Sequence, residues 1–147
     1  MRTAILSLTI LASFALACPA LAIQDSMPPA SWQKEGPEAH AEKVMNGLVN
    51  GGHEKAFKLL FSRGRYPQAT LEKIQFDYYQ MVKKQGNPAA YEKIFEQKAG
   101  SSIVRLKYIL LFKSQPMMFD LYYYSTGKDW LLKTFTISRD IKKIFER

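Results

Sequence analysis

The chain has 147 residues and a formal net charge of +8 at pH 7, with 21 basic residues, 13 acidic residues and a single cysteine. One cysteine excludes an internal disulfide framework. The basic residues are scattered, with no run longer than Lys83-Lys84 or Lys142-Lys143, which argues against a nucleic-acid or membrane-surface footprint. A chain of this length is expected to form one domain with its own core.

The first 22 residues have the pattern of a secretory signal peptide. Arg2 supplies the positive start, residues 4–17 form a short apolar run, and Ala20-Leu21-Ala22 fits the small-x-small cleavage rule. We expect export, to a bacterial periplasm in the favoured interpretation, and no transmembrane span in the mature chain. The alternatives are a membrane anchor, for which the apolar run is short, and a lipid anchor on Cys18, where the lipobox leucine stands one place late.

Residues 23–36, which include two prolines and Trp32, are expected to form a flexible leader before a single domain over residues 37–147. Pro37 suits the first turn of a helix that stops at Asn50-Gly51-Gly52. A second short helix is predicted over residues 53–62. The third, over residues 68–85, carries apolar side chains on one face of a 3.6-residue period. These side chains are Leu71, Ile74, Tyr78, Met81 and Val82.

The apolar pattern then changes to alternation, which indicates strands. Strands are predicted over residues 91–97, 103–113, 117–124 and 130–138, the first of them also compatible with a short helix. Alternation breaks at Leu131-Leu132, where a bulge would restore the register. A basic tail follows, with one helical turn. Helices followed by an antiparallel meander predict an α+β fold, with three helices on one face of a curved sheet of about four strands.

This order includes an apolar helix, Ala56-Phe57-x-Leu59-Leu60-Phe61, an aromatic strand over residues 119–124, and Trp130-x-Leu132-x-x-Phe135. Over Pro37 to Ser138 it resembles small exported bacterial proteins of the nuclear-transport-factor-2-like (NTF2-like), or cystatin-like, α+β class. The resemblance implies a conical pocket between the helices and the sheet. It also implies that some members of the class are enzymes with an Asp/His or Asp/Tyr pair in that pocket, and that many only bind or assist.

Period-2 spacing places Arg105 and Lys107 on one face of their strand, and Asp120, Tyr122 and Tyr124 can share that face from the next strand. Mixed cations and tyrosines are typical of protein interfaces. These five residues are the candidate binding surface, for a protein partner or for a homodimer through the sheet. The alternative is that the C-terminal tail, or the leader with Trp32, covers Ile109 and Leu111 on this face.

Asp120 allows two interpretations. Facing solvent, it would pair across the strands with Arg105 or Lys107, which is the favoured interpretation. Inside the helix–sheet pocket, it could act as the acid/base group of a small hydrolase or isomerase. Neither His40 nor His53 has a second ligand at a metal-binding spacing, and no phosphate loop, nucleophile elbow or paired-carboxylate motif is present.

We therefore expect no metal and no cofactor. The favoured function is an exported, non-enzymatic binding or accessory module that engages a small apolar ligand or a protein partner through the sheet or the pocket. The alternative is the hydrolase or isomerase that uses Asp120. The dense aromatic residues are expected to be mainly core, with Trp130 covering one end of it.

Overall fold

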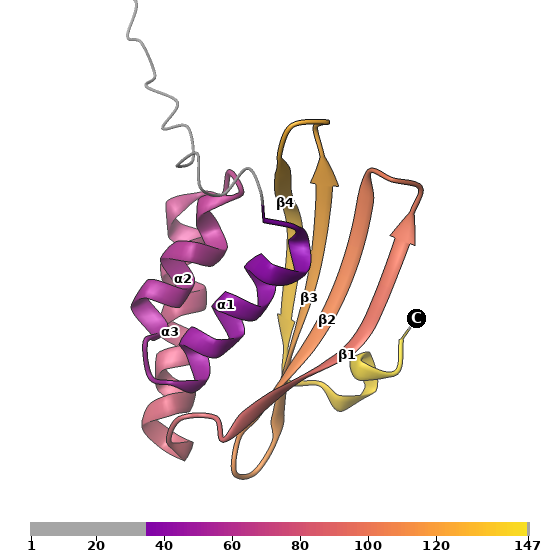
Figure 1. Cartoon of the computed structure of the whole chain (residues 1–147). Coiled ribbons are helices and arrows are strands. Elements are labelled where there is room, and N and C mark those ends of the chain that lie inside the picture. The colour runs from indigo at the N-terminus through magenta and orange to yellow at the C-terminus, as the bar shows by residue number, and fades with distance from the viewer. Residues whose placement is uncertain (1–34, 147) are drawn as a thin grey trace, which may run out of the picture.

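The computed structural model describes residues 35–146, in which three helices precede four strands and a short terminal helix (Figure 1). The predicted signal peptide, Cys18 and Trp32 lie outside the described residues. No helix within residues 35–146 is long and apolar enough to span a bilayer. The elements are α1 (Pro37–Val49), α2 (His53–Ser62), α3 (Gln68–Gln85), β1 (Ala90–Ala99), β2 (Ile103–Leu111), β3 (Pro116–Ser125), β4 (Trp130–Ser138) and η2 (Ile141–Ile144).

The helix boundaries agree with those predicted from proline, glycine and the apolar period. The first strand is a strand and not a helix, and β2 ends at Leu111, so Lys113 lies in the following turn. The sheet is an antiparallel meander of order β1-β2-β3-β4. Its register shifts where Tyr122 pairs with Thr134 and Tyr123 pairs with Leu132, which leaves Lys133 as the extra residue. The bulge predicted at Leu131-Leu132 is therefore one residue further along.

The three helices cover one face of the sheet, and η2 lies on the opposite face (Figure 1). Alternation along β2 decides which side chains meet the helices: Leu106, Tyr108 and Leu110 are fully buried in the core. The same holds on β3, where the hydroxyl of Tyr123 reaches His40 of α1. The predicted α+β fold, with helices on one face of a four-stranded antiparallel sheet, is confirmed.

Two parts of the sequence-based picture need correction. The sheet is uncurled. Within residues 35–146, core side chains fill the space between the sheet and α1 and α2, and the cavity between helix and sheet lies at α3 instead. Most aromatic residues of the described chain are buried or half-buried as expected, but Phe76 and Tyr79 of α3 are 60% and 51% exposed. Trp130 is half-buried and packs against the edge of the core.

The loop after α2 is clamped to β4. The backbone N–H of Leu132 donates to the carbonyl of Arg63 at 2.8 Å, and the hydroxyl of Tyr66 donates to the carbonyl of Leu132 at 2.9 Å. Between them stands Gly64, where a Cβ atom would lie 2.7 Å from that same carbonyl oxygen. Only a residue without a side chain permits this close approach.

Candidate functional site

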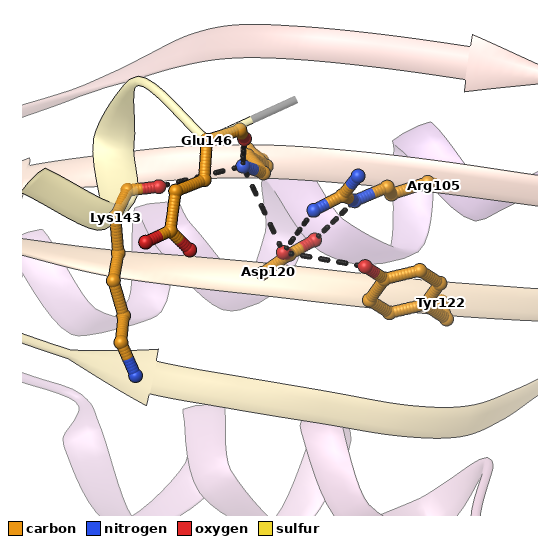
Figure 2. A network of polar contacts seen from close by, with 6 residues as sticks. Arg105, Asp120, Tyr122, Lys143 and Glu146 are labelled. Carbon is orange, nitrogen blue, oxygen red and sulfur yellow. Dashed lines mark hydrogen bonds and ion pairs between the residues drawn. The ribbon is translucent and has the colours of Figure 1, made fainter.

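Asp120 is the centre of a polar network on the sheet face away from the helices (Figure 2). Arg105 donates two hydrogen bonds to the carboxylate of Asp120, from Nε to Oδ1 at 3.0 Å and from Nη2 to Oδ2 at 2.8 Å. The Nζ atom of Lys107 lies 3.9 Å from Oδ2, and the hydroxyl of Tyr122 donates to the same oxygen at 3.5 Å. The cross-strand pairing predicted for Asp120 is therefore confirmed.

The C-terminal segment covers this network. Lys107 is only 2% exposed because its ammonium donates to the backbone carbonyls of Lys143, at 3.5 Å, and Glu146 (Figure 2). Asp120 is 6% exposed. The expectation that Asp120 faces solvent is wrong, because a tail that is distant in sequence folds back over the strand. The C-terminal tail, one of the two segments considered above as a cover for this face, lies over Lys107.

Aromatic rings complete the network. The guanidinium of Arg105 lies 5.0 Å from the ring centroid of Tyr122 and 5.4 Å from that of Phe95 on β1, and Lys107 lies 5.6 Å from Phe95. Phe95 was not singled out from the sequence, although it lies directly opposite Lys107 in the register. Tyr124, at the end of the same face, is 41% exposed. Of the five predicted binding residues, four form one network, and Tyr124 is the most accessible.

The geometry contradicts a catalytic Asp120 in a helix–sheet pocket. The residue points away from the helices, and both of its carboxylate oxygens are engaged by Arg105, while Lys107 and Tyr122 approach one of them. A general base needs a free lone pair within reach of a substrate proton. Asp120 is better understood as the acceptor that joins β2 to β3, while Lys107 binds the tail.

His40 is also structural. Its Nε2–H donates to the carbonyl of Leu59 at 3.0 Å, so Nδ1 is the acceptor for the hydroxyl of Tyr123 at 2.8 Å. Burial lowers the pKa of His40 to about 4 and raises the pKa of Tyr123, so both groups stay neutral at pH 7. Within residues 35–146, no three His, Cys, Asp or Glu side chains are grouped to hold a metal ion.

A cavity of about 450 Å³ lies between α3 and the ends of β3 and β4. We call it the α3 cavity. It forms because α3 buries only Tyr78 and Met81 fully, which leaves room along the rest of the helix. Its apolar lining residues are Ile74, Tyr78, Met81, Met117 and Ile137. Its polar lining residues are Asp77, Gln80, Lys84, Gln85, Gln115, Ser138 and Arg139.

Sequence reasoning did not bring these residues together. The helical stripe identified Ile74, Tyr78 and Met81 as apolar, but Gln115 stands in a turn and Arg139 follows the last strand. A weak signal was available, because the start of β3 and the end of β4 meet at one edge of an antiparallel sheet. A second, more open groove of about 380 Å³ lies between α2 and α3, beside the exposed Phe76 and Tyr79.

The sequence matches no family model and no curated protein. One solved structure matches: that of a Campylobacter jejuni protein described as an NTF2-like transpeptidase, with a TM-score of 0.53 and 12% sequence identity. The match covers 68% of this chain and 99% of the other. The fold is NTF2-like. At this identity the similarity establishes the architecture alone, and it confirms the fold that the order of helices and strands suggested.

Proposed function

We propose that this protein is a binding module that holds a small molecule in the α3 cavity. The observation that carries the proposal is the cavity itself, whose volume of about 450 Å³ falls within the range of roughly 300–1,000 Å³ common for small-molecule sites. Apolar side chains from a helix and two strands line one part of it, and the polar side chains that line the rest are groups that orient a bound molecule. An NTF2-like fold is compatible with this role.

The α3 cavity is a better candidate than the outer sheet face. Arg105, Lys107 and Asp120 satisfy one another there, and the C-terminal segment covers Lys107. A partner or a second copy of the chain would have to displace that segment first. The α3 cavity needs no such rearrangement.

We further propose that the protein acts after export. The support is the sequence pattern of residues 1–22, with cleavage expected after Ala22. Amino-terminal sequencing of protein recovered from the periplasm of an expressing bacterium tests this. A first residue of Ile23 supports cleavage there, whereas a lipid-modified start at Cys18 or an intact Met1 contradicts it.

The binding proposal is tested by titrating the full-length chain, labelled with ¹³C at its methionine methyl groups, with octan-1-ol as a neutral apolar probe. Met81 and Met117 line the α3 cavity, so we expect their methyl signals to shift with saturation. Met45, in the core with α1, and Met118, on the outer face of β3, serve as internal controls. Shifts at Met118 without shifts at Met81 and Met117 would contradict the proposal.

A matched pair of variants on α3 provides a second readout. Gln80 lines the α3 cavity and is exposed, so Gln80→Trp should obstruct the cavity without damaging the core. Lys83 is exposed on the same helix and lines neither the cavity nor the α2–α3 groove, so Lys83→Trp adds the same ring elsewhere. We expect the dissociation constant for octan-1-ol to rise only in Gln80→Trp. An unchanged constant in both variants would contradict the assignment.

A further inference from the structure

Three nitrogen donors converge on the sulfur of Met81 in the α3 cavity. The Nε2 atoms of Gln115 and Gln85 lie 3.4 Å and 3.5 Å from the sulfur, and an Nη1 atom of Arg139 lies 3.8 Å from it. They come from three places in the chain: the turn before β3, α3 and the segment after β4. A thioether is a weak acceptor that offers these donors little. Their convergence indicates a position better suited to a ligand oxygen.

The neighbouring Ser114 determines which end of Gln85 faces the cavity. The side-chain oxygen of Gln85 accepts hydrogen bonds from the Ser114 hydroxyl at 2.7 Å and from the Ser114 backbone N–H at 3.3 Å. With its oxygen engaged there, the amide must turn its NH₂ group towards Met81. The donor is therefore held in place before any ligand arrives.

The charge around the cavity favours an anion. Neither Arg139 nor Lys84 forms an ion pair within the part of the chain that the structure describes, and both line the cavity. The one acidic lining residue, Asp77, is paired with Lys73 at 3.0 Å. The protein as a whole carries a net charge of +8, which adds a weaker attraction of the same sign.

We propose that the α3 cavity binds a small carboxylate with an apolar body, an inference that rests on the binding function proposed above. The carboxylate oxygens take the donors of Gln85, Gln115 and Arg139 that now meet the sulfur of Met81. The apolar body lies against Ile74 and Ile137. Exchanging N–H···S contacts for charge-assisted N–H···O⁻ bonds supplies the selectivity, because the latter are much stronger.

The test compares octanoate with octan-1-ol by calorimetric titration of the full-length chain at low ionic strength. Octanoate should bind roughly tenfold more tightly or better, which is the effect of one hydrogen bond to a charged group. Arg139→Met and Gln115→Leu should each weaken octanoate binding by a larger factor than octan-1-ol binding, so that the preference for octanoate falls. Lys128→Met, in the turn at the other end of β3 and β4, is the matched control and should alter neither.

The outcomes separate the two proposals. Equal affinity for octanoate and octan-1-ol in the unmodified protein would overturn the carboxylate inference and leave the binding module in place. Failure of both probes to bind would count against the binding module itself. A preference for octanoate that survives in Arg139→Met and Gln115→Leu would also overturn the inference. N-acetyl-leucine is a peptide-like carboxylate and serves as a third probe. Tighter binding of N-acetyl-leucine than of octanoate would indicate an amino-acid-derived ligand, and the reverse order would indicate a lipid-derived one.

Discussion

Arg105 on β2 and Asp120 on β3 form a two-point ion pair on the sheet face that the helices do not cover, with side chains only 17% and 9% exposed. Lys107 shares the same carboxylate. Asp120→Ala would leave two cations in this nearly buried site without their acceptor. We expect the free energy of unfolding to fall by about 3 kcal/mol, as measured by urea denaturation.

A double-mutant cycle separates the interaction energy between Arg105 and Asp120 from the cost of burying their charges. Arg105→Leu with Asp120→Leu should lose less stability than the sum of the two single changes, because neither member of the pair is then left without the other and only Lys107 loses its carboxylate. Additive losses would contradict this. Arg105→Ala combined with Tyr122→Ala should also destabilise the fold, since removal of Arg105 takes away the principal partner of Asp120.

Gly64→Ala should destabilise the protein by about 2 kcal/mol. The added methyl group would lie 2.2 Å from a ring carbon of Tyr66 and 2.7 Å from the carbonyl oxygen of Leu132, which cannot move without disturbing β4. Gly36→Ala is the control, because no atom lies within 4 Å of a Cβ built there. Thermal or urea unfolding of the two variants should differ clearly. Equal stability would show that the loop after α2 is not clamped to β4.

The stability of the protein should decrease as the pH falls from about 6.5 towards 4. His40 has a pKa of about 4 in the folded protein, against 6.5 when unperturbed, because burial penalises its charged form. Between pH 6.5 and pH 4 the His40 side chain is protonated in the unfolded chain but stays neutral in the folded protein. The contribution of His40 to the free energy of unfolding is therefore complete above pH 6.5 and is lost as the pH falls below that value. The free energy of unfolding lost over this pH interval is about 3 kcal/mol.

The variant His40→Gln isolates this contribution. Glutamine can donate to Leu59 and accept from Tyr123 without titrating, so the difference in unfolding free energy between pH 7 and pH 4.5 should be smaller than in the parent. Urea denaturation at the two pH values measures it. An identical pH dependence in both proteins would mean that other titrating groups cause the loss.

Trp130→Ala should lower the free energy of unfolding by about 2 kcal/mol, because a half-buried ring loses only part of the transfer and cavity terms of a fully buried one. A fully buried aromatic side chain would cost about 3–5 kcal/mol. Leu132→Ala is the comparison within the same strand. Leu132 is 1% exposed, so this substitution should lower the free energy of unfolding by at least as much. A denaturation midpoint equal to that of the parent would place Trp130 on the surface.

Local chemistry in the sequence determined the elements and their faces. Pro37 begins the first helix, and Gly51 and Gly86 follow the ends of α1 and α3. The change in the period of the apolar residues from 3.6 to 2 marks where the sheet begins. Alternation also put Arg105 and Asp120 on one face, because strand side chains point to opposite sides in turn. These features depend on neighbours within a few positions, so a single sequence reveals them.

Only the tertiary structure decided what those faces meet. Asp120 is buried because residues from the far end of the chain return over Lys107, and alternation says nothing about such a return. The donors at Met81 are likewise remote: Gln115 and Arg139 stand 34 and 58 positions away. They converge because closing the meander brings the turn before β3 and the end of β4 beneath α3. Contacts of this separation follow from the packing of whole elements, which no local pattern records.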